Sequence, residues 1–139
     1  MLTTRLEDKD AIRELLHRYC FCMDGGHSDD LAALFTEDGE WIAPYRTAKG
    51  PAAIAAWLGQ SVPPQPRRMH YVMNSIIDCH ARRGTAQSNY LVIVEGVDGP
   101  LPSVCGTYDD ILVKERRGWR FQRRRLIHAF RGEMALRLK

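Results

Sequence analysis

The sequence lacks two features that would place it on a membrane or on nucleic acid. No apolar stretch approaches the roughly 20 residues of a membrane-spanning helix, and the first residues show no apolar signal-peptide core. The net charge of +3 is too small to indicate a nucleic-acid-binding protein by itself. We therefore expect a cytoplasmic protein whose partner is neither a membrane nor nucleic acid.

Cysteines are few, and their spacing is not that of a metal site. The chain has four, Cys20, Cys22, Cys79 and Cys105, with no C-x-x-C pair. We expect them to be reduced and to act as small apolar side chains. The sequence also lacks repeats and low-complexity tracts. Its 139 residues, 45% of them hydrophobic, predict a single domain over residues 1–139.

The first half of the chain has helical patterning. Apolar residues recur at the spacing of an amphipathic helix, at Ile12, Leu15, Leu16, Tyr19, Cys20 and Met23. Gly25-Gly26 is typical of a helix end. Ser28 can cap a short second helix, and Gly50-Pro51 can open a third. A short strand is expected over residues 40–43.

The second half has the patterning of long strands. Four are expected over 67–79, 85–97, 103–114 and 119–130. Their short separators predict an antiparallel meander with the three helices packed on one face, an α+β fold. Such a sheet twists and curls, so we expect a cone with one central pocket. Apolar residues occupy both faces of several strands, which predicts a homodimer or homotrimer.

Asp24 and His70 are the candidates for chemistry in that pocket. Asp24 ends the first helix, where the helix dipole disfavours a carboxylate, although a turn-forming aspartate is the ordinary explanation. Strand alternation predicts that His70 and Asn74 share one face. Imidazole exchanges protons near neutral pH, but an isolated histidine in a strand is usually structural or exposed.

Six segments carry a resemblance to a known family, and they span nearly the whole chain in order. The segments are residues 10–24, 31–41, 50–54, 70–74, 106–110 and 118–125. In these segments the sequence resembles the SnoaL-like branch of the nuclear-transport-factor-2-like superfamily. This resemblance implies three helices on a curled antiparallel or mixed sheet, the cystatin-like roll.

The resemblance also implies roles for individual residues. Scytalone dehydratase and hexachlorocyclohexane dehydrochlorinase, in the same superfamily, share a pocket Asp–His pair, and Asp24 and His70 fall on those positions. Arg124 best matches an arginine that the dehydrochlorinase uses. The pocket lysine of that enzyme is replaced here by Tyr19, which argues against dehalogenation.

These observations predict a cofactor-independent lyase or isomerase of the dehydratase type, acting on a cyclic or aromatic small molecule through a general acid/base pair. The predicted catalytic residues are Asp24 and His70, without a metal. The predicted substrate-binding residues are Tyr19, Tyr45, Asn74, Tyr90, Tyr108 and Arg124.

Several alternatives remain open from the sequence. Arg124 can instead pair with Asp109 or Asp110 on the neighbouring strand, and buried tyrosines are more often core than catalytic. The protein can also be a non-catalytic small-molecule-binding protein, or a partner like the small subunit of ring-hydroxylating dioxygenases. Nucleic-acid binding through the arginine-rich last hairpin has little support.

Overall fold

The computed structural model describes residues 2–61 and 67–131. Over these residues the chain forms three helices and six strands. Their order is α1 (Leu2–Gly25), α2 (Ser28–Ala32), β1 (Phe35–Ala43), β2 (Arg46–Lys49), α3 (Pro51–Ser61), β3 (Arg68–His80), β4 (Arg83–Gly96), β5 (Gly99–Glu115) and β6 (Gly118–Arg131).

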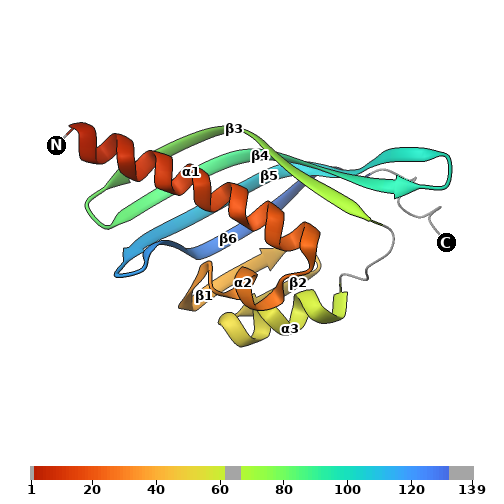
Figure 1. Ribbon diagram of the computed structural model, residues 1–139, viewed down its shortest axis with the longest axis horizontal. Coiled ribbons are helices and arrows are strands. Elements are labelled where there is room, and N and C mark those ends of the chain that lie inside the picture. Colours follow the sequence, from red (N-terminus) through yellow and green to blue (C-terminus); the bar gives the residue numbers. More distant parts are fainter. Residues whose placement is uncertain (1, 62–66, 132–139) are drawn as a thin grey trace.

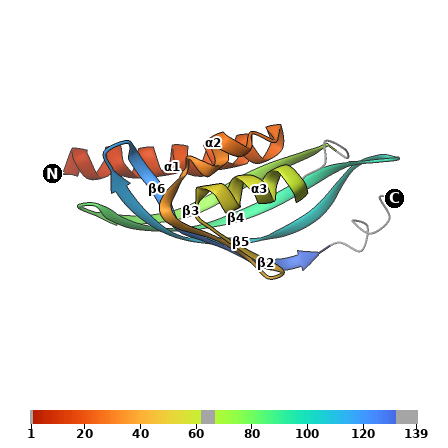
Figure 2. The ribbon, with the colours of Figure 1, turned by 90° about the horizontal axis from the view of Figure 1, so that it is seen from below.

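All six of these strands belong to one sheet, with the order β2-β1-β6-β5-β4-β3. The strands β3 to β6 form the predicted antiparallel meander. Strand β1 pairs with β6 in parallel, so the sheet is mixed. The helices lie on one side of it, with α1 crossing the meander and α3 packed against β1 and β2 (Figures 1 and 2). The predicted α+β class is confirmed.

Bulges interrupt the strand pairing and help the sheet to curl. The register shifts between Val72 and Ser75 in β3, and between Cys105 and Gly106 in β5. A Cβ at Gly106 would collide with the carbonyl oxygen of Ile127, so only glycine fits at this bulge. Figure 2 shows the curved sheet wrapping beneath the helices.

The first strand differs from the prediction. A strand over 40–43 was expected, but β1 begins at Phe35 and includes Asp38 and Gly39, residue types that are typical of turns. The register with β6 shifts between Phe35 and Glu40, so the turn-like residues occupy a bulge within the strand. The hairpin partner β2 was also not predicted, because four residues are too short to show a period.

Helix α1 ends where the sequence predicts, and this end positions Asp24. Gly26 has a φ of 66°, the left-handed conformation that commonly closes a helix. The His27 N–H donates to the Cys22 carbonyl at 3.0 Å, which completes the last turn. Asp24 therefore lies in the final turn of α1, which packs beside β3.

The core lies between the helices and the inner face of the sheet. Its fully buried members include Leu16, Leu31, Ile54, Leu112 and Phe121. The four cysteines are free, as predicted, and burial raises the pKa of the Cys20 thiol to about 11. In the part of the chain that the structure describes, no helix is both long and apolar enough to span a membrane.

Candidate active site

Asp24 and His70 form a direct contact between α1 and β3. The His70 Nδ1 lies 2.6 Å from the Asp24 Oδ1. The backbone N–H of His70 donates to the same carboxylate, at 2.9 Å to Oδ1 and 3.0 Å to Oδ2. Two donors of one residue thus fix the carboxylate, and the carboxylate fixes the ring.

This arrangement assigns the tautomer of the imidazole. An ionised carboxylate only accepts hydrogen bonds, so the proton of a neutral His70 ring belongs on Nδ1. The other nitrogen, Nε2, then carries the basic lone pair. Asp24 and His70 are only partly accessible, with side-chain exposures of 19% and 9%. The pair can therefore take up a proton at Nε2 while Asp24 stabilises the imidazolium.

His70 lines a cavity of about 510 Å³ between the helices and the sheet. Tyr19 and Met23 of α1 line one side, and Val92 of β4 with Tyr108 of β5 line another. Asp24 does not line this cavity, so the carboxylate lies behind the imidazole. Further lining residues are Trp41, Tyr45, Arg46, Trp57, Arg68, Tyr90, Val94, Ser103, Val104, Leu126 and His128. The volume suits a small ring compound.

The lining of this cavity is largely aromatic. Trp41 and Trp57 stack with ring centroids 4.0 Å apart, and Tyr90 and Tyr108 stack at 4.2 Å. Tyr45 is 60% exposed, and its ring lies 6.4 Å from Trp41. Three predicted substrate-binding residues, Tyr45, Tyr90 and Tyr108, therefore do reach the cavity, although their roles stay predictions.

Tyr19 is the buried phenol of the cavity wall. Its hydroxyl oxygen accepts a hydrogen bond from Trp41 Nε1 at 2.8 Å. This bond occupies a lone pair and leaves the phenolic proton to be donated. Burial raises the pKa of Tyr19 above its ordinary value, and nearby Arg124 only partly offsets that effect. Tyr19 is therefore a neutral donor at the pH of a living cell.

Arg124 lies behind the cavity wall and is absent from the lining, which differs from its predicted contact with substrate. It is fully buried and forms a two-pronged ion pair with Asp110, with both N···O distances at 2.8 Å. The pairing with Asp110 that the sequence left open is thus the one present. Burial alone would lower the pKa of Arg124, but the Asp110 carboxylate raises it above the ordinary value.

The guanidinium of Arg124 is enclosed by aromatic rings. Its central carbon lies 4.2 Å from the ring centroid of Tyr19 and 3.9 Å from that of Tyr108. Phe121 lies against it at 4.3 Å. Arg124 therefore supports the two tyrosines that face the cavity, through cation–π contacts.

Asn74 does not share the face of His70, and that prediction was wrong. The side chain is exposed and belongs to neither of the cavities described here. The bulge between Val72 and Ser75 breaks the alternation, so residues on the two sides of it no longer follow one parity. Strict counting by two fails at such a point.

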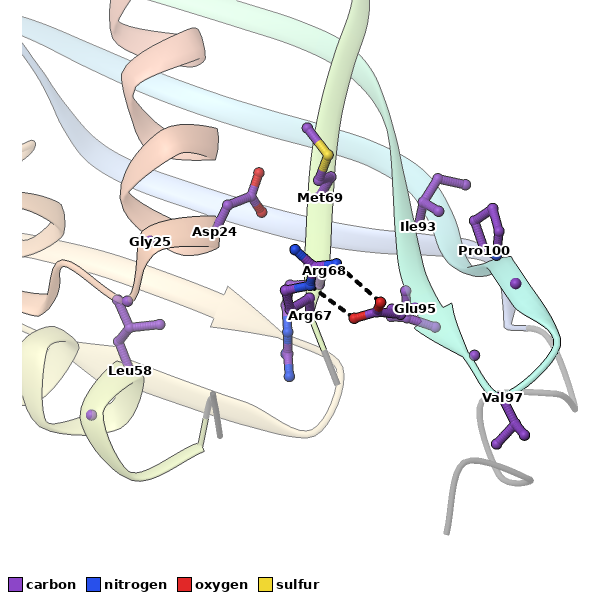
Figure 3. A pocket seen from close by; sticks show the side chains of 15 residues that line it. Asp24, Gly25, Leu58, Arg67, Arg68, Met69, Ile93, Glu95, Val97 and Pro100 are labelled. Carbon is purple, nitrogen blue, oxygen red and sulfur yellow. Dashed lines mark hydrogen bonds and ion pairs between the residues drawn. The ribbon is translucent and has the colours of Figure 1, made fainter. Parts of the chain in front are cut away.

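A second, more open cavity of about 1000 Å³ lies beside the first (Figure 3). Asp24, Leu58 and Met69 line it, together with Arg67, which pairs with Glu95 at 2.8 and 3.0 Å. Arg68 lines both cavities. Arg68 was not among the predicted site residues, although it lies two residues before His70 on the same strand and so shares its face.

Over 2–61 and 67–131, no group of three or more His, Cys, Asp or Glu side chains is arranged to hold an ion.

Comparisons with known proteins connect this geometry to a family. A search of curated proteins found no match. A solved structure of a proposed scytalone dehydratase from Novosphingobium aromaticivorans is 28% identical, covering 96% of this chain and 91% of that one, with a TM-score of 0.81. An NTF2-like protein with a cystatin-like fold from the same bacterium is 27% identical, covering 96% and 89%, with a TM-score of 0.85.

A third structure contains a ligand. It is a protein of Catenulispora acidiphila in complex with S-DNPA, 26% identical over 86% of this chain and 92% of that one, with a TM-score of 0.77. The family model described as "SnoaL-like domain" matches residues 4–125. That match spans all three helices and most of the sheet, and it includes both Asp24 and His70. This chain belongs to the SnoaL-like domain family.

Proposed function

We propose that this protein is a lyase or isomerase of the dehydratase type that needs no cofactor and acts on a cyclic or aromatic small molecule. The observation that carries the proposal is the 2.6 Å contact between Asp24 Oδ1 and His70 Nδ1 at the wall of a largely aromatic cavity. The likeness to a proposed scytalone dehydratase supports the same class. Dehydration and isomerisation both begin by removing a proton from carbon.

His70 is the general base in this scheme. Its Nε2 takes a proton from a carbon next to a carbonyl, and the C–H electron pair forms the C=C bond of an enolate. The proton now on Nε2 makes an imidazolium, whose charge the Asp24 carboxylate stabilises. In dehydration, a β-hydroxyl leaves and accepts that proton, so the products are water and an unsaturated ketone. In isomerisation, the proton returns to another carbon.

Tyr19 is the donor for the oxygen that becomes negative. Its hydroxyl is oriented by Trp41 Nε1, and burial keeps it protonated. A neutral donor held in an apolar wall stabilises an enolate oxygen without having to reorganise. This role needs no contact from Arg124, which lies behind the ring of Tyr19.

The test uses a β-hydroxy tetralone, a bicyclic ketone that loses water to give naphthol. Formation of naphthol by the wild type is compared with that by His70→Gln, Asp24→Asn and the matched control His80→Gln, which changes an exposed histidine of the same strand. We expect the first two variants to lose about 100- to 10,000-fold in rate, and the control to keep it. Exchange of the protons next to the carbonyl, measured by NMR in deuterium oxide, detects proton removal without loss of water.

The competing function is a binding protein without chemistry. It predicts that tetralone binds to the wild type and to His70→Gln equally, with neither naphthol formation nor proton exchange above background. That outcome would contradict the proposed function.

A further inference from the structure

Arg68 holds a position that the proposed mechanism does not use. It lies two residues before His70 on β3, opposite Val94 of β4, while His70 lies opposite Val92. Both Val92 and Val94 face the 510 Å³ cavity, as do Arg68 and His70. Arg68 and His70 are therefore neighbours on the same inner face, separated along the strand by about 7 Å.

The charge of Arg68 is unpaired among the described residues. Arg67 has Glu95 as a two-pronged partner and Arg124 has Asp110, but Arg68 has no hydrogen bond or ion pair within residues 2–61 and 67–131. Its side chain is partly buried, where the two cavities meet. Burial lowers the pKa of Arg68, and the carboxylate of Asp24 partly opposes that effect. A partly desolvated guanidinium without a partner favours an anionic ligand.

The permanently charged side chains that line this cavity are all cationic. They are Arg46 and Arg68, and none of the described lining residues is Asp or Glu. The Asp24 carboxylate lies behind His70, and its oxygens accept the hydrogen bonds of that residue. A negatively charged ligand would thus meet cationic groups without a competing carboxylate on the wall.

The rest of the cavity wall is largely aromatic. Trp41 stacks on Trp57 there, and Tyr90 stacks on Tyr108. We propose that the substrate is an amphiphilic anion, a cyclic or aromatic carboxylate whose carboxylate group binds Arg68 while its ring lies against these aromatic side chains. The planar fork of a guanidinium matches a carboxylate in a two-pronged geometry. This proposal rests on the proposed function for its choice of cavity, and it specifies the substrate class.

The test measures binding of naphthoate and of its neutral analogue naphthamide by calorimetry. The two ligands share a ring system and differ in charge, so the ratio of their dissociation constants measures the contribution of the anionic group to binding. We expect the wild type to bind naphthoate at least about 10-fold more tightly than naphthamide. Arg68→Gln should weaken naphthoate binding by about 10- to 100-fold and leave naphthamide binding unchanged.

The matched control is Arg67→Gln, which removes the neighbouring arginine that lines the other cavity and pairs with Glu95. It should leave both affinities as they are. Thermal melting checks that Arg68→Gln is folded, as expected for a side chain without a described partner. Equal binding of the two ligands, equal loss of both in Arg68→Gln, or no naphthoate binding at millimolar concentration would overturn the proposal.

The two proposals fail in different ways. His70→Gln should retain the preference for naphthoate, because binding to Arg68 does not require the base. If naphthoate binds through Arg68 but no substrate turns over, the anionic site stands and the dehydratase proposal fails. If the protein dehydrates the β-hydroxy tetralone but does not bind naphthoate, the catalytic pair is supported and the anionic substrate class is contradicted.

Discussion

Asp24 holds His70 at two places, the ring and the backbone N–H. A single carboxylate therefore sets both the position of the strand residue and the orientation of its imidazole. Because the imidazole is already held in one orientation, the general base needs no further ordering before proton transfer. At the residue scale, the site is thus built from a helix end and a strand start that lie 46 residues apart in sequence.

Removing only the hydroxyl of Tyr19 tests its role as donor. We expect Tyr19→Phe to lower kcat about 100- to 1,000-fold with a smaller change in KM, since the lost interaction acts mainly on the enolate. Turnover of the β-hydroxy tetralone gives both constants. Tyr71→Phe, on the exposed outer face of β3, is the control and should match the wild type. An unchanged kcat in Tyr19→Phe would exclude the donor role.

The elements show which parts of the structure were predictable from the sequence. Helix α1 and the four long strands could be predicted, because each shows its apolar period over many residues. The choice of Asp24 and His70 as site candidates came from the SnoaL-like resemblance, because the apolar period alone does not distinguish them from structural residues. The face of Asn74 was predicted wrongly because a bulge in β3 breaks the alternation of side chains there. That bulge arises from the pairing of β3 with β4, which the sequence does not show. Arg68 was not predicted because its lack of an ion-pair partner among the described residues depends on how the strands and helices pack together.

The meander is held internally by the ion pair between β5 and β6. Replacing Arg124 by Met leaves Asp110 buried without its partner, so we expect a loss of about 3–5 kcal/mol in the free energy of unfolding. Arg125→Met is the matched control, since Arg125 pairs with Asp109 at the surface and should contribute less than about 1 kcal/mol. Urea unfolding measures both. Similar losses of unfolding free energy in the two variants would contradict the assignment of Arg124–Asp110 as the buried ion pair.

The start of α1 is tied to the β5–β6 hairpin through Asp8. This carboxylate accepts hydrogen bonds from Lys114 Nζ at 2.7 Å and Trp119 Nε1 at 2.9 Å, and these bonds lower its pKa. A lowered carboxyl pKa stabilises the fold above the unfolded value of about 3.9, and that stability disappears as the pH falls through the folded value. The wild type should therefore exceed Asp8→Asn in stability near neutral pH, with the difference shrinking below about pH 4. A difference that does not change with pH would contradict this assignment.

At the scale of the whole molecule, the helices cover one face of the sheet and the opposite face carries exposed apolar side chains. On β3 these are Met69, Tyr71 and Met73, and on β6 they are Ile127 and Phe130. Large apolar side chains gathered on one exposed sheet face favour an interface there. The homodimer or homotrimer predicted from the sequence stays a prediction, and this face is where we expect its contact.

Sedimentation equilibrium measures the assembly directly. We expect the wild type to have the mass of a dimer or trimer at micromolar concentration, and the double variant Tyr71→Lys/Ile127→Lys to have that of a monomer, because two buried charges in each copy disfavour the contact. His17→Lys, on the exposed side of α1 and away from this sheet face, provides a single-charge control and should keep the mass of the wild type. A monomeric wild type would contradict the expectation.

The central claim is that Asp24 holds the proton of His70 on Nδ1 and leaves Nε2 as the base. Nitrogen NMR of histidine-labelled protein tests it without knowledge of the substrate, because the chemical shifts and ring couplings distinguish the two tautomers. His70→Gln assigns the signals, and Asp24→Asn removes the carboxylate. We predict that neutral His70 is the Nδ1–H tautomer in the wild type and loses that preference in Asp24→Asn. A wild-type signal from the Nε2–H tautomer would contradict the account.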